Sequence, residues 1–336
     1  MRYKLLGRSG LRVSELALGT MTFGEDWGWG ASEEESRRIF DRYAEAGGNF
    51  IDTANNYTNG TSERFVGQFV AADRDHFVVA TKYALTERTD DPNFGGNHRK
   101  NLMRSLAGSL RRLGTDHVDV LWLHMWDGAT PLDEILRAMD DLVRAGKVLH
   151  VGFSDTPAWV VARAAAIAEL RGWTRPVAVQ LPYSLASRSP ERELLPMARE
   201  LEIAVTPWGL LEEGVLTGKY RRKADEPRRN RSAGKRLMAV GDAVAELAEE
   251  IGRSPAQVAT NWVRQQPGTI VPIVGTRTEA QLKDNIGCLD FELTQDEIAR
   301  LSEASPIELG FPRSFLESDG VRELIFGATY DLIDQP

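Results

Sequence analysis

The sequence predicts an α/β protein that folds as one closed (β/α)8 barrel, the TIM barrel architecture. Eight short apolar segments recur along the 336 residues, and helix-patterned stretches separate them. Short apolar segments are typical of strands buried on both faces of a parallel sheet, and eight strand–helix alternations close such a sheet with right-handed crossovers. A doubly wound sheet is the structural alternative, but no Gly-x-Gly-x-x-Gly fingerprint follows the first strand. We therefore expect residues 1–336 to form a single domain.

The expected strands and the clearest helices alternate along the chain. The strands are Ala17–Thr20, Asn49–Ala54, Phe77–Tyr83, Val118–His124, Val148–Ser154, Ala178–Tyr183, Ile203–Trp208 and Thr269–Gly275. Apolar residues near every third or fourth position predict helices over Ser32–Ala46, Arg99–Leu113, Leu132–Ala145 and Pro157–Arg171. Ser254 before Pro255 and Thr156 before Pro157 are typical helix starts.

The remaining segments are the two ends and three long loops. Arg2–Glu15, with its turn at Gly7–Gly10, predicts an N-terminal β-hairpin. Long loops follow three strands, at Met21–Ala31, Ala84–His98 and Gly209–Lys235. In a barrel, the loops after strands carry function. The C-terminal extension from about Leu301 to Pro336 fits no barrel repeat, and it either folds over the open end or forms a solvated helix.

Composition narrows the class of protein. At 42% hydrophobic and 27% charged residues the chain resembles soluble globular proteins, and its net charge of -8 argues against a nucleic-acid partner. The N-terminus lacks the apolar run of a signal peptide, and no window approaches the roughly 20 apolar residues of a membrane span. The single cysteine, Cys288, excludes an internal disulfide and a cysteine-based metal cluster. We expect a cytoplasmic protein without a metal.

Four polar residues occupy the ends of neighbouring strands. Asp52, Lys82 and His124 end the second, third and fourth expected strands, and Tyr57 lies just past Asp52. A lysine ammonium beside a tyrosine favours tyrosinate and brings its pKa towards the working range; a carboxylate keeps the lysine charged, and a histidine orients a carbonyl. Singly, each has an ordinary alternative: a cap, a solvated strand end, a surface aromatic or a core histidine. Their joint placement predicts one catalytic site.

These residues carry a family resemblance, which extends from Arg2 to about Leu293. The segments that resemble aldo-keto reductase signatures are Phe50-Ile-Asp-Thr-Ala54 with Tyr57, the Ser62-Glu63 helix start, Lys82 after a β-rich run, and His124 within Leu121-Trp-Leu-His-Met125. The resemblance implies that Tyr57 is the general acid, that Lys82 and Asp52 tune it, and that His124 orients the substrate carbonyl.

The resemblance also implies a nicotinamide site. Gly152-Phe-Ser-Asp155 is similar to the family's Gly-x-Ser-Asn, in which Ser154 and the next residue would hold the carboxamide; here Asp155 replaces asparagine. An aspartate accepts a hydrogen bond from the amide but donates one only when protonated. Gln180 would meet the same carboxamide, and Trp208 would stack on the ring, with plain core filling as its alternative.

A loop and three strand-end residues would hold the rest of the dinucleotide. Gly209–Tyr220 resembles the loop that covers the pyrophosphate, where backbone N–H groups make the contacts. Glu212 and Glu213 stand where small residues are usual, and we expect them to point outward because carboxylates repel a pyrophosphate. The implied contacts here are Gly19, Thr20, Met21, Gly209, Leu210, Leu211, Gly214 and Lys219, and Asp52 is implied to contact the cofactor as well.

Ile273–Asn285 resembles the segment that reads the adenosine 2′-phosphate and adenine. Gly275 and Arg277 lie beside a helix start, where N–H groups and the helix dipole attract anions; a surface charge is the alternative for Arg277. Gln281 and Asn285, four residues apart, suit the adenine and ribose. The implied cofactor is therefore NADP(H).

The expected function is NADPH-dependent reduction of an aldehyde or ketone, with hydride transfer to the carbonyl carbon and a proton from Tyr57. Two alternatives remain: a redox-sensing regulatory subunit, since the pattern is also similar to the β subunits of voltage-gated potassium channels, and an NAD-dependent alcohol dehydrogenase. Trp27, Trp29, Tyr83 and Trp126 lie in or beside loops after strands and favour an aromatic or bulky apolar substrate, unless they pack against one another. The sequence does not indicate an oligomeric state.

Overall fold

The computed structural model describes residues 1–218 and 234–334, and it shows the barrel that the sequence predicts. Eight parallel strands pair in the order β10-β3-β4-β5-β6-β7-β8-β9, and a bridge between Val205 and Ile270 brings the two edges together. The strands are β3 Ala17–Gly19, β4 Phe50–Asp52, β5 Val78–Tyr83, β6 Val118–Leu123, β7 Val148–Ser154, β8 Pro176–Pro182, β9 Ala204–Trp208 and β10 Ile273–Gly275. Below, "mouth" means the carboxyl ends of these eight strands.

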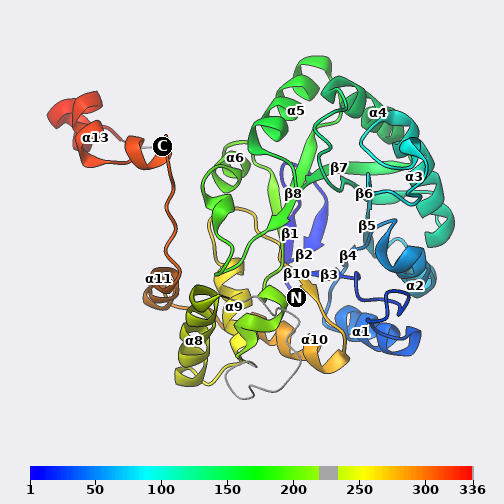
Figure 1. The fold of residues 1–336 in the computed structure, drawn as a ribbon, viewed down its shortest axis with the longest axis horizontal. Helices are drawn as coiled ribbons and strands as arrows, with labels where there is room; N and C mark the ends of the chain where they lie inside the picture. Colours follow the sequence, from blue (N-terminus) through cyan, green and yellow to red (C-terminus); the bar gives the residue numbers. More distant parts are fainter. Residues whose placement is uncertain (219–233, 335–336) are drawn as a thin grey trace.

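Helices surround the strands (Figure 1). Among the described residues they are α1 Glu33–Glu45, α2 Thr61–Val70, α3 Arg99–Leu113, α4 Leu132–Arg144, α5 Ala158–Arg171, α6 Leu194–Glu200, α8 Lys235–Glu250, α9 Pro255–Arg264, α10 Glu279–Ile286, α11 Gln295–Ala304, α12 Arg313–Leu316 and α13 Asp319–Phe326. Ser254 forms the capping box of α9 with Gln257. Thr156 does not cap α5, because its hydroxyl donates to Ser154 O instead and Pro157 is the residue before the helix.

The predicted N-terminal hairpin is confirmed and closes the amino-terminal end of the barrel. Its strands β1 (Tyr3–Leu5) and β2 (Arg12–Ser14) are antiparallel. Leu6 and Val13 are fully buried among the side chains inside the barrel. The turn needs glycine at position 7, where φ is +59°. A Cβ on this residue would lie 2.0 Å from Val177 O, which is too close.

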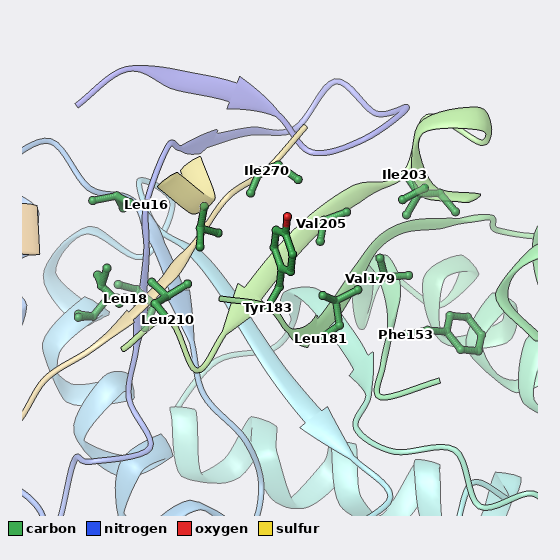
Figure 2. Close-up of a cluster of buried hydrophobic side chains, with 14 of the residues drawn as sticks. Leu16, Leu18, Phe153, Val179, Leu181, Tyr183, Ile203, Val205, Leu210 and Ile270 are labelled. Carbon is green, nitrogen blue, oxygen red and sulfur yellow. The ribbon is translucent and has the colours of Figure 1, made fainter. Parts of the chain in front are cut away.

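Two apolar layers explain why the strands are apolar on both faces. Side chains inside the barrel, such as Phe50, Val120 and Trp122, form one buried cluster. A larger cluster fills the space between strands and helices, and Figure 2 shows part of it around Val179 and Leu181 of β8. Because successive residues of a strand point to opposite faces, the alternation decides which side chains face the interior and which face the helices.

The C-terminal extension, residues 306–334, lies to one side of the barrel. In Figure 1 an extended segment leaves α11, and α13 lies outside the ring of helices rather than over the strands. The Arg313 guanidinium donates to Glu191 O, and Arg192 donates to Glu308 O over 2.9 Å. Of the two alternatives for this segment, the structure therefore agrees with a helix beside the barrel and not with a segment folded over the open end. None of the helices in the described residues is long and apolar enough to cross a membrane.

Candidate active site

Parallel pairing brings Asp52, Lys82 and His124 together at the mouth. β4 ends at Asp52, Lys82 is the next-to-last residue of β5, and His124 directly follows β6. Lys82 is in register with Trp122, and the His124 N–H donates to Tyr83 O over 2.9 Å. Residues that end adjacent parallel strands must lie at one end of the barrel, so the placement expected from the sequence holds in the structure.

Lys82 is the centre of a buried hydrogen-bonded group. Its Nζ donates to Asp52 Oδ2 over 2.5 Å, to Thr53 O over 2.9 Å and to Tyr57 Oη over 3.1 Å. The Lys82 side chain is fully buried, so all three of its ammonium protons have protein acceptors. We call Asp52, Tyr57, Lys82 and His124 the tetrad.

Gln180 joins the tetrad from β8, on a distant strand. Its Nε2 donates to Asp52 Oδ1 over 2.9 Å, and only 4% of the residue is exposed. Asp52 therefore accepts from Lys82 on one oxygen and from Gln180 on the other. The sequence assigned Gln180 to the cofactor carboxamide and missed this contact, because nothing in the spacing of residues 128 positions apart signals it.

A strained turn holds Tyr57 over the strand ends. Thr58 and Asn59 have φ values of 43° and 54°, in the left-handed region, and the Thr58 hydroxyl donates to Phe23 O over 2.6 Å. Left-handed residues other than glycine are uncommon and recur at functional sites. The Tyr57 ring makes edge contacts with the rings of His124 and Trp27, at centroid distances of 5.9 and 6.5 Å.

Burial sets the protonation of the tetrad. Desolvation raises the pKa of Tyr57, and the nearby Lys82 ammonium opposes this without reversing it. Burial also disfavours the Lys82 ammonium, but Asp52 and Tyr57 outweigh burial and leave the pKa of Lys82 raised. Burial and Lys82 lower the pKa of His124 to about 3. At neutral pH the site thus holds a neutral phenol, an ammonium and a neutral imidazole. Lys82 lowers the pKa of Tyr57 as expected, but burial outweighs Lys82, so the expectation that this pKa moves towards the working range is corrected.

Two buried polar atoms at the mouth lack protein partners. In the described part of the chain, Ser154 Oγ and His124 Nδ1 are both buried without a hydrogen-bond partner. Buried polar groups in native proteins are nearly always paired, so unpaired atoms at neighbouring strand ends indicate a place for a bound polar group. Ser154 is one of the two residues expected to hold a carboxamide.

Asp155 and Trp208 form a pair beside these atoms. Asp155 has φ 43°, and its N–H donates to Gln180 O over 3.0 Å. The Trp208 indole lies near enough to the Asp155 carboxylate to favour its charged form. Burial raises the pKa of Asp155, and Trp208 and Lys82 oppose that rise. Trp208 is 40% exposed at the end of β9, so it does not simply fill the core.

The residues at the end of β3 and just after it mostly make contacts that stabilise the barrel. A Cβ on Gly19 would lie 2.7 Å from the Ile273 side chain, so glycine allows close strand packing there. Thr20 is fully buried, and its hydroxyl donates to Asp52 O over 3.0 Å. Met21 is exposed and stays available to a ligand.

The expected 2′-phosphate site has one feature that the sequence did not reveal. Arg277 is exposed, and its N–H donates to Gln281 Oε1 over 3.0 Å. The first N–H of α10, that of Glu279, already donates to the Glu35 carboxylate over 2.7 Å. That carboxylate would compete with a phosphate for the helix start. Within this described segment, a phosphate site would therefore depend mainly on Arg277. Gly275 and Gln281 are exposed, whereas Asn285 is buried.

The loop after β9 corrects one expectation. Glu212, Glu213 and Gly214 all have positive φ values, of 45°, 53° and 90°. Glu213 is exposed, but the Glu212 carboxylate turns towards the β8 loop, where it accepts from Ser184 Oγ over 2.7 Å. Glu212 therefore does not point outward, because Ser184 offers it a hydrogen-bond donor. Of the other expected contacts, Leu210 is buried, Gly209 and Leu211 line the same turn, and Lys219 lies outside the described residues.

The four aromatic residues expected to contact substrate separate into two groups. Trp27 and Trp29 pack together at 5.6 Å, and Trp27 also touches Tyr57, so they lie beside the tetrad. Trp126 is half-buried and packs against the outer core. Tyr83 is fully buried and its hydroxyl donates to Asn97 O over 3.3 Å. Because Lys82 faces inward, Tyr83 must face the helices, and its assignment to the substrate pocket is wrong.

Comparison with known proteins agrees with this geometry. Residues 15–306 match the model of the aldo/keto reductase family. The norsolorinic acid reductase of Emericella nidulans is 38% identical, over 92% of this chain and 82% of its own length. An NADP(+) aryl-alcohol dehydrogenase of Phanerodontia chrysosporium is 36% identical, over 90% and 85%, and a putative aryl-alcohol dehydrogenase of Saccharomyces cerevisiae is 35% identical, over 95% and 90%. The chain therefore belongs to the aldo/keto reductase family of oxidoreductases.

Proposed function

We propose that this protein is an NADPH-dependent reductase of aldehydes or ketones, with Tyr57 as its general acid. The observation that carries the proposal is the buried hydrogen bond from Lys82 Nζ to Tyr57 Oη, in a site whose other members are the Asp52 carboxylate and a neutral His124. Without Lys82, no bonded cation would stabilise the tyrosinate that is left when Tyr57 gives up its proton.

The residues act on the proton that a carbonyl oxygen needs as it gains negative charge. Burial keeps Tyr57 protonated until that charge develops. When the phenol proton leaves, Lys82 stabilises the tyrosinate that remains, and Asp52 keeps Lys82 charged. His124, as a neutral imidazole, donates a hydrogen bond to the carbonyl oxygen and orients it. The bound cofactor would supply the hydride that completes the reduction.

Several residues fit a nicotinamide cofactor. Ser154 Oγ is buried without a partner in the described residues, and the exposed Trp208 offers a flat aromatic face next to Asp155. These three residues would hold the nicotinamide end. Arg277 would bind the 2′-phosphate, and Gly209, Leu211 and Gly214 would cover the pyrophosphate.

The substrate class follows from the side chains nearest to Tyr57. Trp27 contacts the Tyr57 ring, and Trp29 packs on Trp27. Two indoles beside a general acid favour aromatic carbonyl compounds, because offset ring contacts add to the burial of apolar surface. The relatives named as aryl-alcohol dehydrogenases agree with this class.

The proposal is tested by steady-state oxidation of NADPH with aromatic, aliphatic and keto substrates, followed by absorbance. We expect turnover of aromatic aldehydes at the highest kcat/KM, and a smaller value for NADH than for NADPH. Binding of NADPH without steady turnover of any substrate would contradict the proposed reductase activity and favour a redox-sensing subunit. Equal use of NADH would favour an NAD-dependent dehydrogenase.

A further inference from the structure

Asp155 is a carboxylate fixed at the mouth without taking part in the proton transfer. Its N–H is held by Gln180 O, while the Gln180 side chain contacts Asp52 of the tetrad. Its carboxylate lies near the Trp208 indole, which favours the charged form. The left-handed φ of 43° suits aspartate and asparagine better than most residues, so either would keep this geometry. The charge is what distinguishes aspartate at this position.

The charges near Tyr57 do not balance. Those that act on it are the Lys82 ammonium and the Asp52 and Asp155 carboxylates, and His124 contributes none because its pKa is about 3. Asp52 is the carboxylate bonded to Lys82, at 2.5 Å, so the negative charge of Asp155 has no bonded cation within this group of residues. A partly buried, uncompensated carboxylate favours a positively charged ligand.

The two forms of a nicotinamide cofactor differ in this respect. The oxidised ring is a cation and the reduced ring is neutral, while the phosphates and the adenosine are the same in both. We propose that Asp155 makes this site prefer the oxidised over the reduced form of its nicotinamide cofactor. The inference rests on the proposed function, since it presumes that the ring lies between Ser154, Asp155 and Trp208.

The preference has a consequence for the direction of reaction. A carboxylate a few ångströms from a unit positive charge in a partly desolvated site favours the cation by roughly tenfold or more. By thermodynamic linkage, a protein that binds the oxidised form more tightly also makes the bound reduced form a better hydride donor. Asp155 would thus favour carbonyl reduction on the protein and slow the release of the oxidised cofactor.

The test compares dissociation constants of NADP+ and NADPH, measured separately by quenching of tryptophan fluorescence, for the unmodified protein and Asp155→Asn. Asparagine keeps the shape and a hydrogen-bond acceptor for Trp208 but removes the charge. We expect Asp155→Asn to weaken NADP+ binding roughly tenfold and to change NADPH binding less than about twofold. Asp26→Asn, which removes an exposed charge from the loop after β3, is the matched control and should leave both constants unchanged.

A pH series separates charge from shape. Burial raises the pKa of Asp155, so its negative charge is lost as pH falls through that raised pKa. The ratio of the NADPH dissociation constant to the NADP+ dissociation constant should fall towards the value for Asp155→Asn as the pH is lowered. The same ratio for the variant should not change with pH. Tyr57 and Lys82, the other titratable groups that act on Asp155, both have raised pKa values and hold their protons throughout. Titration of the 2′-phosphate cancels in the ratio.

If Asp155→Asn changes both dissociation constants by the same factor, or if the ratio for the unmodified protein does not vary with pH, the inference is overturned. Asp155 would then be a hydrogen-bonding residue only. The proposed function fails in a different way, if the unmodified protein binds none of NADP+, NADPH, NAD+ and NADH. If only the NAD forms bind, the same comparison is made with NAD+ and NADH, because the ring chemistry is identical. Matching thermal unfolding of Asp155→Asn and the unmodified protein shows that the fold is retained.

Discussion

The barrel mouth buries charged side chains, whereas the C-terminal extension exposes apolar ones. At the mouth, Lys82 and Asp52 are buried charges that bond each other. In the extension, Phe311, Leu324 and Leu332 are 84%, 84% and 81% exposed. Burying charges costs free energy that close pairing offsets, whereas exposed apolar groups contribute nothing to the stability of the folded chain. The proposed chemistry therefore depends on the well-packed region, and we expect the extension to contribute little to folding.

The largest effect should come from removing the proposed general acid. We expect Tyr57→Phe to lower kcat by about 100- to 10,000-fold with little change in cofactor binding, because the hydroxyl is needed only when the carbonyl oxygen gains charge. Steady-state kinetics and a cofactor titration measure both quantities. Turnover close to that of the unmodified protein would remove the tetrad from the mechanism.

Removing one partner of the buried ion pair between Lys82 and Asp52 should lower the stability of the protein. Lys82→Met leaves Asp52 bonded to Gln180 but without its cation, and we expect a loss of roughly 3–5 kcal/mol in the free energy of unfolding together with most of the activity. Denaturant unfolding monitors the first effect. The double variant Lys82→Met with Asp52→Asn should recover part of the stability and none of the turnover. A single variant as stable as the unmodified protein would show that the pair is not desolvated.

Arg277 should affect a ligand without affecting the fold. We expect Arg277→Ala to weaken NADPH by roughly 10- to 150-fold and NADH much less, since only NADPH carries the 2′-phosphate. Arg42→Ala is a matched control, because Arg42 lies next to α10 and pairs with Glu279 at 2.9 Å. Dissociation constants for both cofactors decide the question. Equal losses would assign Arg277 to the pyrophosphate or to the fold.

The smallest effect on stability should come from the extension. Ending the chain after Gly310 removes α12, α13 and their exposed apolar side chains, and we expect the free energy of unfolding to change by less than about 1 kcal/mol. We also expect less self-association, because exposed apolar surface promotes it. Denaturant unfolding and size-exclusion chromatography measure the two effects. A loss of several kcal/mol would mean that the extension packs on the barrel in solution.

Local pattern was enough to predict the barrel and the position of the tetrad. Apolar runs and helix periodicity repeat along the chain, and parallel pairing brings strand ends together at one end whatever the details of packing. Asp52, Lys82 and His124 could therefore be placed side by side from their positions at strand ends alone. The strict alternation along β5 could also have excluded Tyr83 from the mouth, since it follows the inward-facing Lys82.

Only the tertiary structure determined the side-chain contacts between distant elements and the pKa shifts that burial causes. Gln180 reaches Asp52, Glu212 accepts from Ser184, and Glu35 takes the first N–H of α10. None of these contacts follows from sequence spacing, because each joins side chains from separate elements. Burial, too, reverses the pKa shift expected for Tyr57. Desolvation is a property of the whole packed environment. The residue types alone therefore predicted which groups meet at the mouth, and the fold determined their protonation.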